Sequence, residues 1–371
     1  NIMKIYLIGD YPLLKSRSMN SYVKLIKIIL GKNFKIKIIK PKIILNRLNF
    51  KNHSIQKWLG YIDNYILFGI FLFFKIKRND LVHICNQSNS LLFPFIKSKK
   101  LILTCHDLVN ISLLNNKSLH KFSKLSLISK VYHKLILHFI IKFKSIICVS
   151  KNTKKELRKY MNFKNKNIYT IHQSLNDNFY KINYKEKKIF LRKKKINFKF
   201  FLHVGTDVWY KNKNNLIKVF FNFIKINKRK NFKLILIGDY NSIELISLIR
   251  ILQLQEKIII IKNIDINDLR SYYSTAEALI FPSIVEGFGW PIVEAQKCGS
   301  LVFTTKKAPM NEVGLNSVFY INPSNPKKSA LIIDEKLRLK NRMIKKGFKN
   351  IKRFNLENFF TKMTSVYSKY Q

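Results

Sequence analysis

Acidic residues are scarce in this chain of 371 residues: 20 Asp and Glu stand against 70 Lys and Arg, a formal net charge of +50. A charge of this sign and size attracts polyanions, so nucleic acid and anionic membranes are the partner classes to weigh. The lysines are spread over the whole chain, and no recognised nucleic-acid-binding motif accompanies them. An anionic membrane surface is therefore the favoured partner, and no specific nucleic acid is expected. A second explanation of the charge stays open, because Lys, Asn and Ile are the residues that adenine- and thymine-rich codons encode.

Cysteine is also rare. The chain has four cysteines, and none of them forms a paired C-x-x-C spacing: Cys85, Cys105, Cys148 and Cys298. This pattern argues against a disulfide framework and a cysteine-based zinc site. The histidines have no spacing suited to a metal site either. The sequence predicts a reduced, cytoplasmic protein that holds no metal.

Apolar runs of the 18 or more residues that a membrane span requires are missing. The best candidate covers residues 65–74 and is followed by Lys75, Lys77 and Arg78. Two interpretations stay open for it: a buried helix of a first domain, or an element that enters the headgroup layer while the basic residues meet anionic lipid. The chain shows no signal-segment pattern at its start, where residues 3–9 predict a buried strand.

Short apolar runs alternate with longer segments of helical period. Strands are expected at residues 4–9, 35–39, 81–85, 101–105, 145–149 and 168–171, and in a second set at 200–204, 233–237, 257–261, 278–281 and 301–304. This alternation is typical of an α/β protein with two doubly wound parallel sheets. Residues 181–199 are charged and lack a clear apolar period, so they are interpreted as a linker between the two domains.

The strongest local pattern lies in residues 281–299, where a buried strand leads into a glycine-rich turn and a helix. Glu286 lies in the turn, Pro291 is expected to be the first residue of the helix, and Glu294 follows one turn later. Backbone N–H groups and the positive end of the helix then lie beside the turn, where a diphosphate could bind. The alternative is a plain strand-to-helix connection with two solvated acids.

These residues together resemble the retaining glycosyltransferases of family 4, also called glycosyl transferases group 1, which have the GT-B fold. The resemblance implies two Rossmann-like domains facing across a cleft: an N-terminal acceptor-side domain over residues 1–180, the linker at 181–199, and a donor-binding domain over 200–345. Residues 346–371 would form a C-terminal helix that crosses back to the first domain. No cofactor is implied beyond the donor substrate, and the missing Asp-x-Asp motif fits a transfer without metal.

Roles follow from the same resemblance, residue by residue. Glu286 would contact hydroxyls of the donor sugar, Glu294 would hold the nucleotide ribose, and the turn would contact the donor phosphates through Gly287, Phe288 and Gly289. Near residues 200–212, the chain keeps Gly205 and Lys211 of the family's phosphate clamp but has Thr206 in the place of an arginine. Lys211, assisted by Lys213, is then the principal cation for the leaving diphosphate.

The remaining candidates come from other strand ends. His106 matches the family's Thr-x-His-Asp motif, whose histidine lies beside the donor sugar and the acceptor. Asn263 and Ile264 occupy the place where the family's backbone contacts the base. In the loop after the first strand, Arg17 and Ser18 replace paired glycines: Arg17 is a candidate for an anionic acceptor or phosphate, and Ser18 for a helix cap.

The function expected from these residues is retaining transfer of a hexose from a nucleoside diphosphate sugar to a hydroxyl of a glycan or lipid-linked acceptor. The setting would be assembly of a cell-envelope polysaccharide or lipopolysaccharide, with the protein peripheral on the inner face of the cell membrane. His106, Lys211 and Glu286 would be the catalytic group. Two alternatives stay open: a GT-B epimerase or phosphorylase, and a non-enzymatic polyanion-binding protein.

Overall fold

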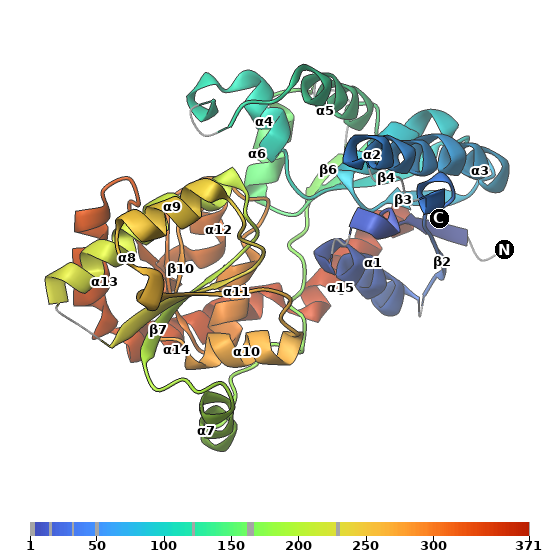
Figure 1. Cartoon of the computed structure of the whole chain (residues 1–371). Helices are drawn as coiled ribbons and strands as arrows, with labels where there is room; N and C mark the ends of the chain where they lie inside the picture. The colour runs from blue at the N-terminus through green and yellow to red at the C-terminus, as the bar shows by residue number, and fades with distance from the viewer. Residues whose placement is uncertain are drawn as a thin grey trace. The chain divides into compact units, whose positions relative to one another are not determined.

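The computed structural model describes residues 4–14, 17–31, 33–48, 52–120, 123–161, 167–227 and 231–370 (Figure 1). The chain divides into two compact units. Unit 1 comprises residues 1–173 together with 356–371, and unit 2 comprises residues 174–355. Each unit is built around one parallel β-sheet.

The sheet of unit 1 has six parallel strands in the order β2-β1-β3-β4-β5-β6. The strands are β1 (Lys4–Ile8), β2 (Lys35–Ile39), β3 (Leu81–Ile84), β4 (Lys100–Cys105), β5 (Ser145–Cys148) and β6 (Asn167–Thr170). All six match the strands expected from apolar runs. β1 lies between β2 and β3, so the chain reverses its direction of travel across the sheet at β1.

Helices cover this sheet. The α-helices of unit 1 are α1 (Arg17–Leu30), α2 (His53–Tyr61), α3 (Phe68–Lys75), α4 (Val109–Asn115), α5 (Leu127–Ile140), α6 (Lys151–Arg158) and α15 (Leu356–Tyr367). Shorter helical pieces are η1 (Pro12–Leu14), η2 (Leu45–Leu48), the π-helix η3 (Ile62–Leu67), η4 (Gln87–Phe95), η5 (Lys117–Leu119) and η10 (Ser368–Tyr370). No helix within the described ranges is long and apolar enough to cross a membrane.

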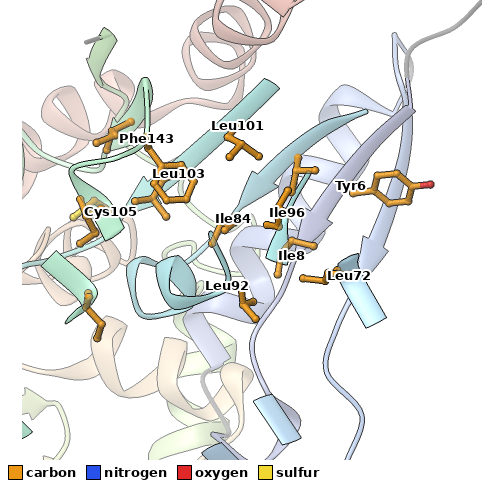
Figure 2. Packing of buried hydrophobic residues seen from close by; sticks show 14 of the residues in the cluster. Tyr6, Ile8, Leu72, Ile84, Leu92, Ile96, Leu101, Leu103, Cys105 and Phe143 are labelled. Atoms are coloured by element: carbon orange, nitrogen blue, oxygen red, sulfur yellow. The ribbon is translucent and has the colours of Figure 1, made fainter. Parts of the chain in front are cut away.

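Two hydrophobic clusters form the core of unit 1. One joins β1, β3 and β4 to α3 and η4, with Ile8, Leu72, Leu92 and Leu103 fully buried (Figure 2). The other packs α1 and the end of the chain against the sheet, and Phe359 and Met363 of α15 are buried in it. The last helix is therefore a structural part of unit 1, although the rest of the C-terminal region belongs to unit 2.

The sheet of unit 2 also has six parallel strands, in the order β12-β11-β10-β7-β8-β9. The strands are β7 (Lys199–Val204), β8 (Phe232–Ile237), β9 (Ile258–Ile261), β10 (Ala278–Phe281), β11 (Leu301–Thr304) and β12 (Phe319–Tyr320). The first five were expected, whereas β12 is too short to leave an apolar run. β7 and β10 are neighbours in the sheet although two strands separate them in the sequence.

The helices of unit 2 begin with α7 (Tyr184–Lys193), α8 (Lys213–Asn227), α9 (Ile243–Ile251) and α10 (Ile266–Thr275). They continue with α11 (Trp290–Lys297), α12 (Met310–Gly314), α13 (Pro326–Leu337) and α14 (Lys340–Ile351). Shorter pieces are η6 (Trp209–Lys211), η7 (Gln255–Lys257), η8 (Leu315–Ser317) and η9 (Lys352–Phe354). The core between these helices and the sheet is rich in phenylalanine, with Phe201, Phe220 and Phe223 fully buried.

The segment interpreted as a linker contains a helix. Asn183 and Glu186 form a capping box that begins α7, and Phe190 packs edge-on against Tyr272 of α10, with ring centroids 4.9 Å apart. Because α7 buries little more than this one side chain, its sequence shows no apolar period. The linker interpretation of residues 181–199 is therefore wrong for residues 184–193, which are part of unit 2.

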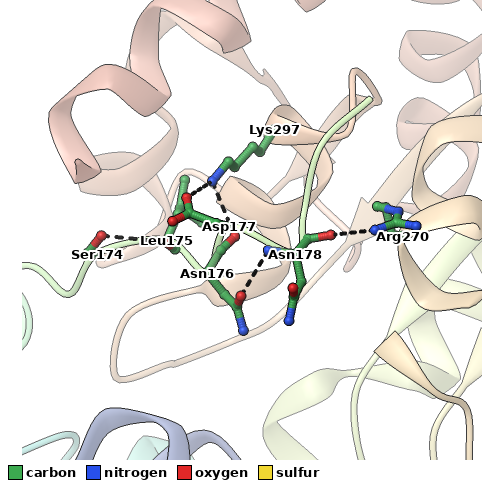
Figure 3. Close-up of polar contacts among 7 residues, drawn as sticks. All are labelled: Ser174, Leu175, Asn176, Asp177, Asn178, Arg270 and Lys297. Atoms are coloured by element: carbon green, nitrogen blue, oxygen red, sulfur yellow. Dashed lines mark hydrogen bonds and ion pairs between the residues drawn. The ribbon is translucent and has the colours of Figure 1, made fainter. Parts of the chain in front are cut away.

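The chain attaches to unit 2 before α7 begins. Lys297, at the end of α11, donates to the carbonyl of Asn176 at 3.2 Å and pairs with Asp177 at 3.0 Å (Figure 3). Arg270 of α10 donates to the carbonyl of Asn178 at 3.1 Å. These contacts explain why the boundary between the units falls at residue 173.

A substitution at one glycine of unit 2 would test how closely the ends of β7 and β8 are packed. Gly238 follows β8 with a φ of +145°, and a Cβ there would overlap the carbonyl oxygen of Gly205 after β7. We expect Gly238→Ala to lower the free energy of unfolding by about 3 kcal/mol or more, because strain and overlap add. Gly9→Ala is the matched control, since its Cβ would meet only the flexible Lys40 side chain. Urea denaturation of both variants measures the difference, and equal losses would contradict the packing described here.

Candidate functional site

The carboxyl ends of β7 and β10 form the central candidate site in unit 2. These strands are adjacent in the sheet, yet β8 follows β7 toward one edge and β11 follows β10 toward the other. The chain therefore leaves β7 and β10 toward opposite edges of the sheet, and doubly wound sheets bind ligands at such a point. The loop after β7 contains Gly205 and Lys211, and the loop after β10 contains Glu286.

Lys211 and Glu286 form an ion pair in which the lysine Nζ lies 2.7 Å from the glutamate Oε1. Both side chains are mostly buried, so solvent screens the pair less than a surface pair. The ammonium also lies 4.7 Å from the ring centroid of Phe281, the last residue of β10. The stem of Lys211 runs past Gly205, where a Cβ would approach it to 3.0 Å. The glycine thus leaves space for the lysine to reach the site.

Two backbone contacts fix the loops that present this pair. The Ile284 N–H donates to the carbonyl of Tyr210 at 2.8 Å, which ties the loop after β10 to the loop after β7. Asn212, whose φ is +56°, donates from its side chain to the carbonyl of Pro282 at 3.1 Å. The positions of Lys211 and Glu286 are therefore set by the two loops together.

The glycine-rich turn leads directly into α11. Gly289 precedes the helix with a φ of +108°, a conformation that residues with a Cβ rarely adopt. The helix begins at Trp290, one residue before the expected Pro291, which lies in its first turn. Phe288 is buried against Phe354, with ring centroids 5.4 Å apart, so it anchors the turn. The positive end of α11 lies beside Gly287 and Gly289, an arrangement suited to an anion.

Glu294 lies one turn into α11 and receives a hydrogen bond of 2.9 Å from the hydroxyl of Tyr273. Burial raises the pKa of its carboxyl to about 7, although the bond from Tyr273 and the nearby charge of Lys211 act in the opposite direction. The structure thus brings Lys211, Glu286 and Glu294 into one electrostatic group. Tyr273 was not singled out from the sequence, because nothing in its local pattern distinguishes it from a core tyrosine.

Lys213 has a different environment from Lys211. It pairs with Asp207 and lies 4.9 Å from the ring centroid of Tyr240. Asp207 also accepts the backbone N–H groups of Asn241 and Ser242, at 3.0 and 2.8 Å. Lys213 therefore serves first to neutralise the carboxylate that holds the start of α9, while Lys211 faces the glycine-rich turn.

The other donor-side candidates lie along the same edge of the sheet. Thr206 is exposed after β7, and Asn263 and Ile264 follow β9, which β8 separates from β7. Asn263 has a φ of +49°, so the chain turns sharply where β9 ends. Thr206, Asn263 and Ile264 are therefore candidates by their position at this edge of the sheet.

Unit 1 has its own polar cluster at the carboxyl ends of β1, β3, β4 and β6. Asp10 follows β1 and is buried, and it accepts hydrogen bonds from the amides of Asn86 at 3.0 Å and Asn89 at 3.2 Å. His106 follows β4 and Gln173 follows β6. These side chains meet because parallel strands end at the same edge of a sheet.

His106 is buried and uses both ring nitrogens. Its Nε2 donates to the carbonyl of Cys85 at 2.8 Å, and its Nδ1 accepts from the amide of Gln173 at 3.0 Å. Burial lowers the pKa of His106 to about 4, although the bond to Cys85 and the charge of Asp10 favour the protonated form. The imidazole is therefore neutral near pH 7 and has no spare nitrogen with which to take a proton.

A hydrogen-bonded chain connects the surroundings of His106 to the last helix of the protein. Tyr22 packs edge-on against His106, at 4.9 Å between ring centroids, and its hydroxyl lies 2.9 Å from the Thr104 hydroxyl. His83 bonds Thr104 at 2.7 Å through Nε2 and Tyr367 of α15 through Nδ1. All five side chains are buried, so α15 helps to fix the strand end that presents His106.

Two candidates of unit 1 gain no support. α1 begins at Arg17, which places Ser18 inside the helix, so the expectation that Ser18 caps it is wrong. The side chains of both residues lie outside the described part of the chain. Among the residues that the structure describes, no three His, Cys, Asp or Glu side chains gather in a way that could hold a metal ion.

Comparison with known proteins identifies relatives over most of the chain. A family model described as glycosyl transferases group 1 matches residues 185–350, and one described as glycosyltransferase family 4 matches residues 53–179. The chain is 30% identical over 275 residues to the O-antigen chain mannosyltransferase RfbU of Salmonella typhimurium. That match covers 69% of this chain and 72% of the relative.

Solved structures share the whole architecture. Sucrose-phosphate synthase from Thermosynechococcus elongatus superimposes with a TM-score of 0.74 at 14% identity, over 99% of this chain and 98% of that one. The Anabaena protein HepE, in complex with UDP and glucose, gives a TM-score of 0.72 at 15% identity, over 99% of this chain and 100% of that one. At these identities the likeness shows a common fold.

The raised pKa of Glu294 predicts a pH-dependent gain of stability when this carboxyl is removed. The folded state binds the proton more tightly than the unfolded chain, so ionisation opposes folding increasingly from about pH 4.5 to about pH 7 and by a constant amount above. Glu294→Gln keeps an acceptor for Tyr273 and cannot ionise. We expect its advantage over the wild type to grow by about 2 to 3 kcal/mol between pH 5 and pH 8.

Denaturation at both pH values measures this advantage. The control is Glu335→Gln, because a hydrogen bond from Lys336 lowers the pKa of Glu335, and removing that carboxyl brings no gain as the pH rises. A Glu294→Gln advantage that is the same at pH 5 and pH 8 would show that this carboxyl ionises normally.

Proposed function

We propose that this chain, which belongs to the family 4 glycosyltransferases of GT-B fold, transfers a hexose from a nucleoside diphosphate sugar to a hydroxyl of a glycan or lipid-linked acceptor, with retention of configuration. The observation that carries the proposal is the Lys211–Glu286 pair at the divergence of the loops after β7 and β10. A cation and a carboxylate side by side match the two ends of such a donor, the diphosphate and the sugar hydroxyls.

Donor binding would separate this pair. The diphosphate competes for the ammonium of Lys211 and uses the positive end of α11, while Glu286 turns its oxygens to the sugar hydroxyls. Glu294 accepts from the ribose hydroxyls, and Tyr273 holds its second oxygen. The backbone of both loops is already held by the contacts of Ile284 and Asn212, so the rearrangement on binding is confined to the side chains of the pair.

The chemical step follows from that placement. The bond between the anomeric carbon and the diphosphate oxygen breaks, and the acceptor oxygen bonds the same carbon from the side that the diphosphate leaves. The acceptor proton passes to the departing diphosphate oxygen, so no protein base is needed. Lys211 and the helix end stabilise the charge that develops on the diphosphate, which is the task a metal ion performs in other enzymes. We therefore propose transfer without a metal cofactor.

His106 would contribute a fixed, neutral surface rather than acid–base chemistry. In the family this histidine lies beside the donor sugar and the acceptor. In this chain its two ring nitrogens are hydrogen-bonded to Cys85 and Gln173, so its proposed role is to position the substrates and to exclude water from them. The polar cluster around Asp10 lies at the same sheet edge and belongs to the same surface of unit 1.

The biological setting is proposed from the relatives. The Salmonella relative is an O-antigen chain mannosyltransferase, and the Anabaena structure contains UDP and glucose. We propose that this chain acts in the assembly of a cell-envelope polysaccharide or lipopolysaccharide and works at the cytoplasmic face of the membrane. The net charge of +50 favours an anionic bilayer at that face.

Nucleotide binding tests the donor site. We expect one of UDP, GDP, ADP, CDP and dTDP to raise the melting temperature of the wild type selectively, in moderate salt without added metal. Glu294→Ala should lose that shift because it lacks the acceptor for the ribose. Equal, salt-sensitive shifts with every nucleotide in both proteins would mean that charge alone binds them, and the protein would be a polyanion binder.

Transfer activity tests the ion pair. Lys211→Met removes the cation that meets the leaving diphosphate, so we expect transfer to fall about 100-fold or more. Glu286→Gln should also lower it, and the double variant should lose less than the sum because the residues act on one donor. Lys218→Met, an exposed lysine on α8, is the charge-matched control. Radiolabelled donors report transfer, and donor turnover without any acceptor would indicate an epimerase instead.

A further inference from the structure

We propose that the exposed faces of α2, η3, α3 and α5 form one membrane-docking surface that inserts its apolar side chains shallowly into an anionic bilayer. The proposal rests on the proposed function, because a lipid-linked acceptor is presented at such a surface. It adds which residues contact the membrane. It also adds how they bind, namely by insertion of apolar side chains and by attraction of basic side chains to anionic headgroups.

The first half of the docking surface is a stripe along residues 53–75, where α2, η3 and α3 follow one another without a break. Large apolar side chains are exposed to solvent along it: Ile55 and Trp58 on α2, Ile66 on η3, and Ile70, Phe71, Phe73 and Phe74 on α3. The opposite face is buried in unit 1 through Phe68 and Leu72. α3 is thus apolar on both faces up to Lys75, whereas an ordinary surface helix has a polar outer face.

The second half lies on α5. Leu127, Ile128, Val131 and Leu135 are exposed there, at helical spacing. α5 lies alongside the first stripe, since the ring of Tyr132 stacks on that of Tyr61 at 5.6 Å and its hydroxyl lies 2.9 Å from that of Tyr65. α5 and residues 53–75 are therefore neighbours in unit 1 (Figure 1), and each carries exposed apolar side chains.

The exposed charges within residues 53–78 and 123–144 have a single sign. Exposed basic side chains flank both halves: Lys57, Lys75, Lys77, Arg78, Lys97, Lys124, Lys130 and Lys134. Residues 123–144 contain no acidic residue, and the one acid in residues 53–78 is Asp63. Asp63 is buried, and its carboxylate accepts the Tyr11 hydroxyl and the backbone N–H groups of Ile44, Leu45 and Asn46. No described carboxylate of these segments faces the solvent there.

An anionic bilayer fits this surface best. Basic side chains meet the headgroups while Trp58 and the apolar residues reach the acyl boundary, the distribution typical of helices that lie in the membrane interface. Lys97 brings a basic group next to this apolar surface, with its ammonium 3.7 Å from the ring centroid of Phe73. A second copy of the chain is a poor occupant, because a symmetric contact would bring the same positive charges together.

Vesicle sedimentation tests the surface with two matched variants. Phe74→Ser with Leu127→Ser removes one apolar side chain from each stripe, at exposures of 79% and 77%. Ile243→Ser with Ile251→Ser removes two residues of α9 in unit 2, at exposures of 79% and 76%. Neither changes the charge. With phosphatidylcholine vesicles that contain phosphatidylglycerol, we expect the first variant to bind at least about tenfold more weakly than the wild type and the second to bind equally.

Trp58 gives a direct measure of insertion. The chain has three tryptophans, so Trp209→Phe with Trp290→Phe leaves Trp58 as the single reporter. Its emission should shift to the blue on binding these vesicles and be quenched by brominated acyl chains. An emission that stays unchanged while the protein sediments with the vesicles would overturn insertion. Insertion would also be overturned if all variants bound equally and high salt abolished their binding.

Two further measurements distinguish this proposal from the proposed function and from self-association of the chain. Nucleotide-induced stabilisation should be the same in the wild type and the Phe74→Ser, Leu127→Ser variant, since the donor site is in unit 2. If the wild type binds vesicles but no nucleotide, the proposed function is contradicted and the docking surface is still supported. A wild-type dimer that this variant converts to a monomer, with vesicle binding unchanged, would assign the surface to self-association and overturn the proposal.

Discussion

The pairing of β7 with β10 is the constraint on which the candidate site depends. These strands are distant in the sequence, yet their parallel contact places Lys211 and Glu286, 75 residues apart, within 2.7 Å. It also makes the loops after them diverge at the point where doubly wound sheets receive ligands. The contact from Ile284 to Tyr210 and the position of α11 both follow from this pairing.

Desolvation then decides the chemistry of the individual groups. Burial raises the pKa of Glu294 to about 7 and lowers that of His106 to about 4. In both residues burial therefore favours the uncharged form, although the sequence marks both as candidates for a functional site. Glu294 is poised to gain from a ligand that donates hydrogen bonds to its ionised form. Both ring nitrogens of His106 are already hydrogen-bonded, so this residue can contribute only the position and the surface of its ring. Groups held at such a cost to stability are typical of functional sites.

Much of the fold followed from the sequence, because strand and helix periods are local. Eleven strands match the apolar runs, and the segment around Glu286, Gly289 and Glu294 forms the strand, turn and helix that its residue types indicate. The errors have local causes too. α7 buries too few side chains to show a period, β12 has two residues, and α1 begins earlier than the Ser18 cap required.

The sequence by itself determined the class of fold, the family and the donor-side motif, since these depend on residue types at short spacing. Only the tertiary structure decided which groups meet. It paired Lys211 with Glu286 and Lys213 with Asp207, gave Glu294 its partner Tyr273, and tied the strand end before His106 to Tyr367 of the last helix. It also divided the apolar residues of 53–75 between core and solvent. The reason is that solvation and pairing depend on neighbours that long-range strand contacts bring together, and no local pattern encodes those neighbours.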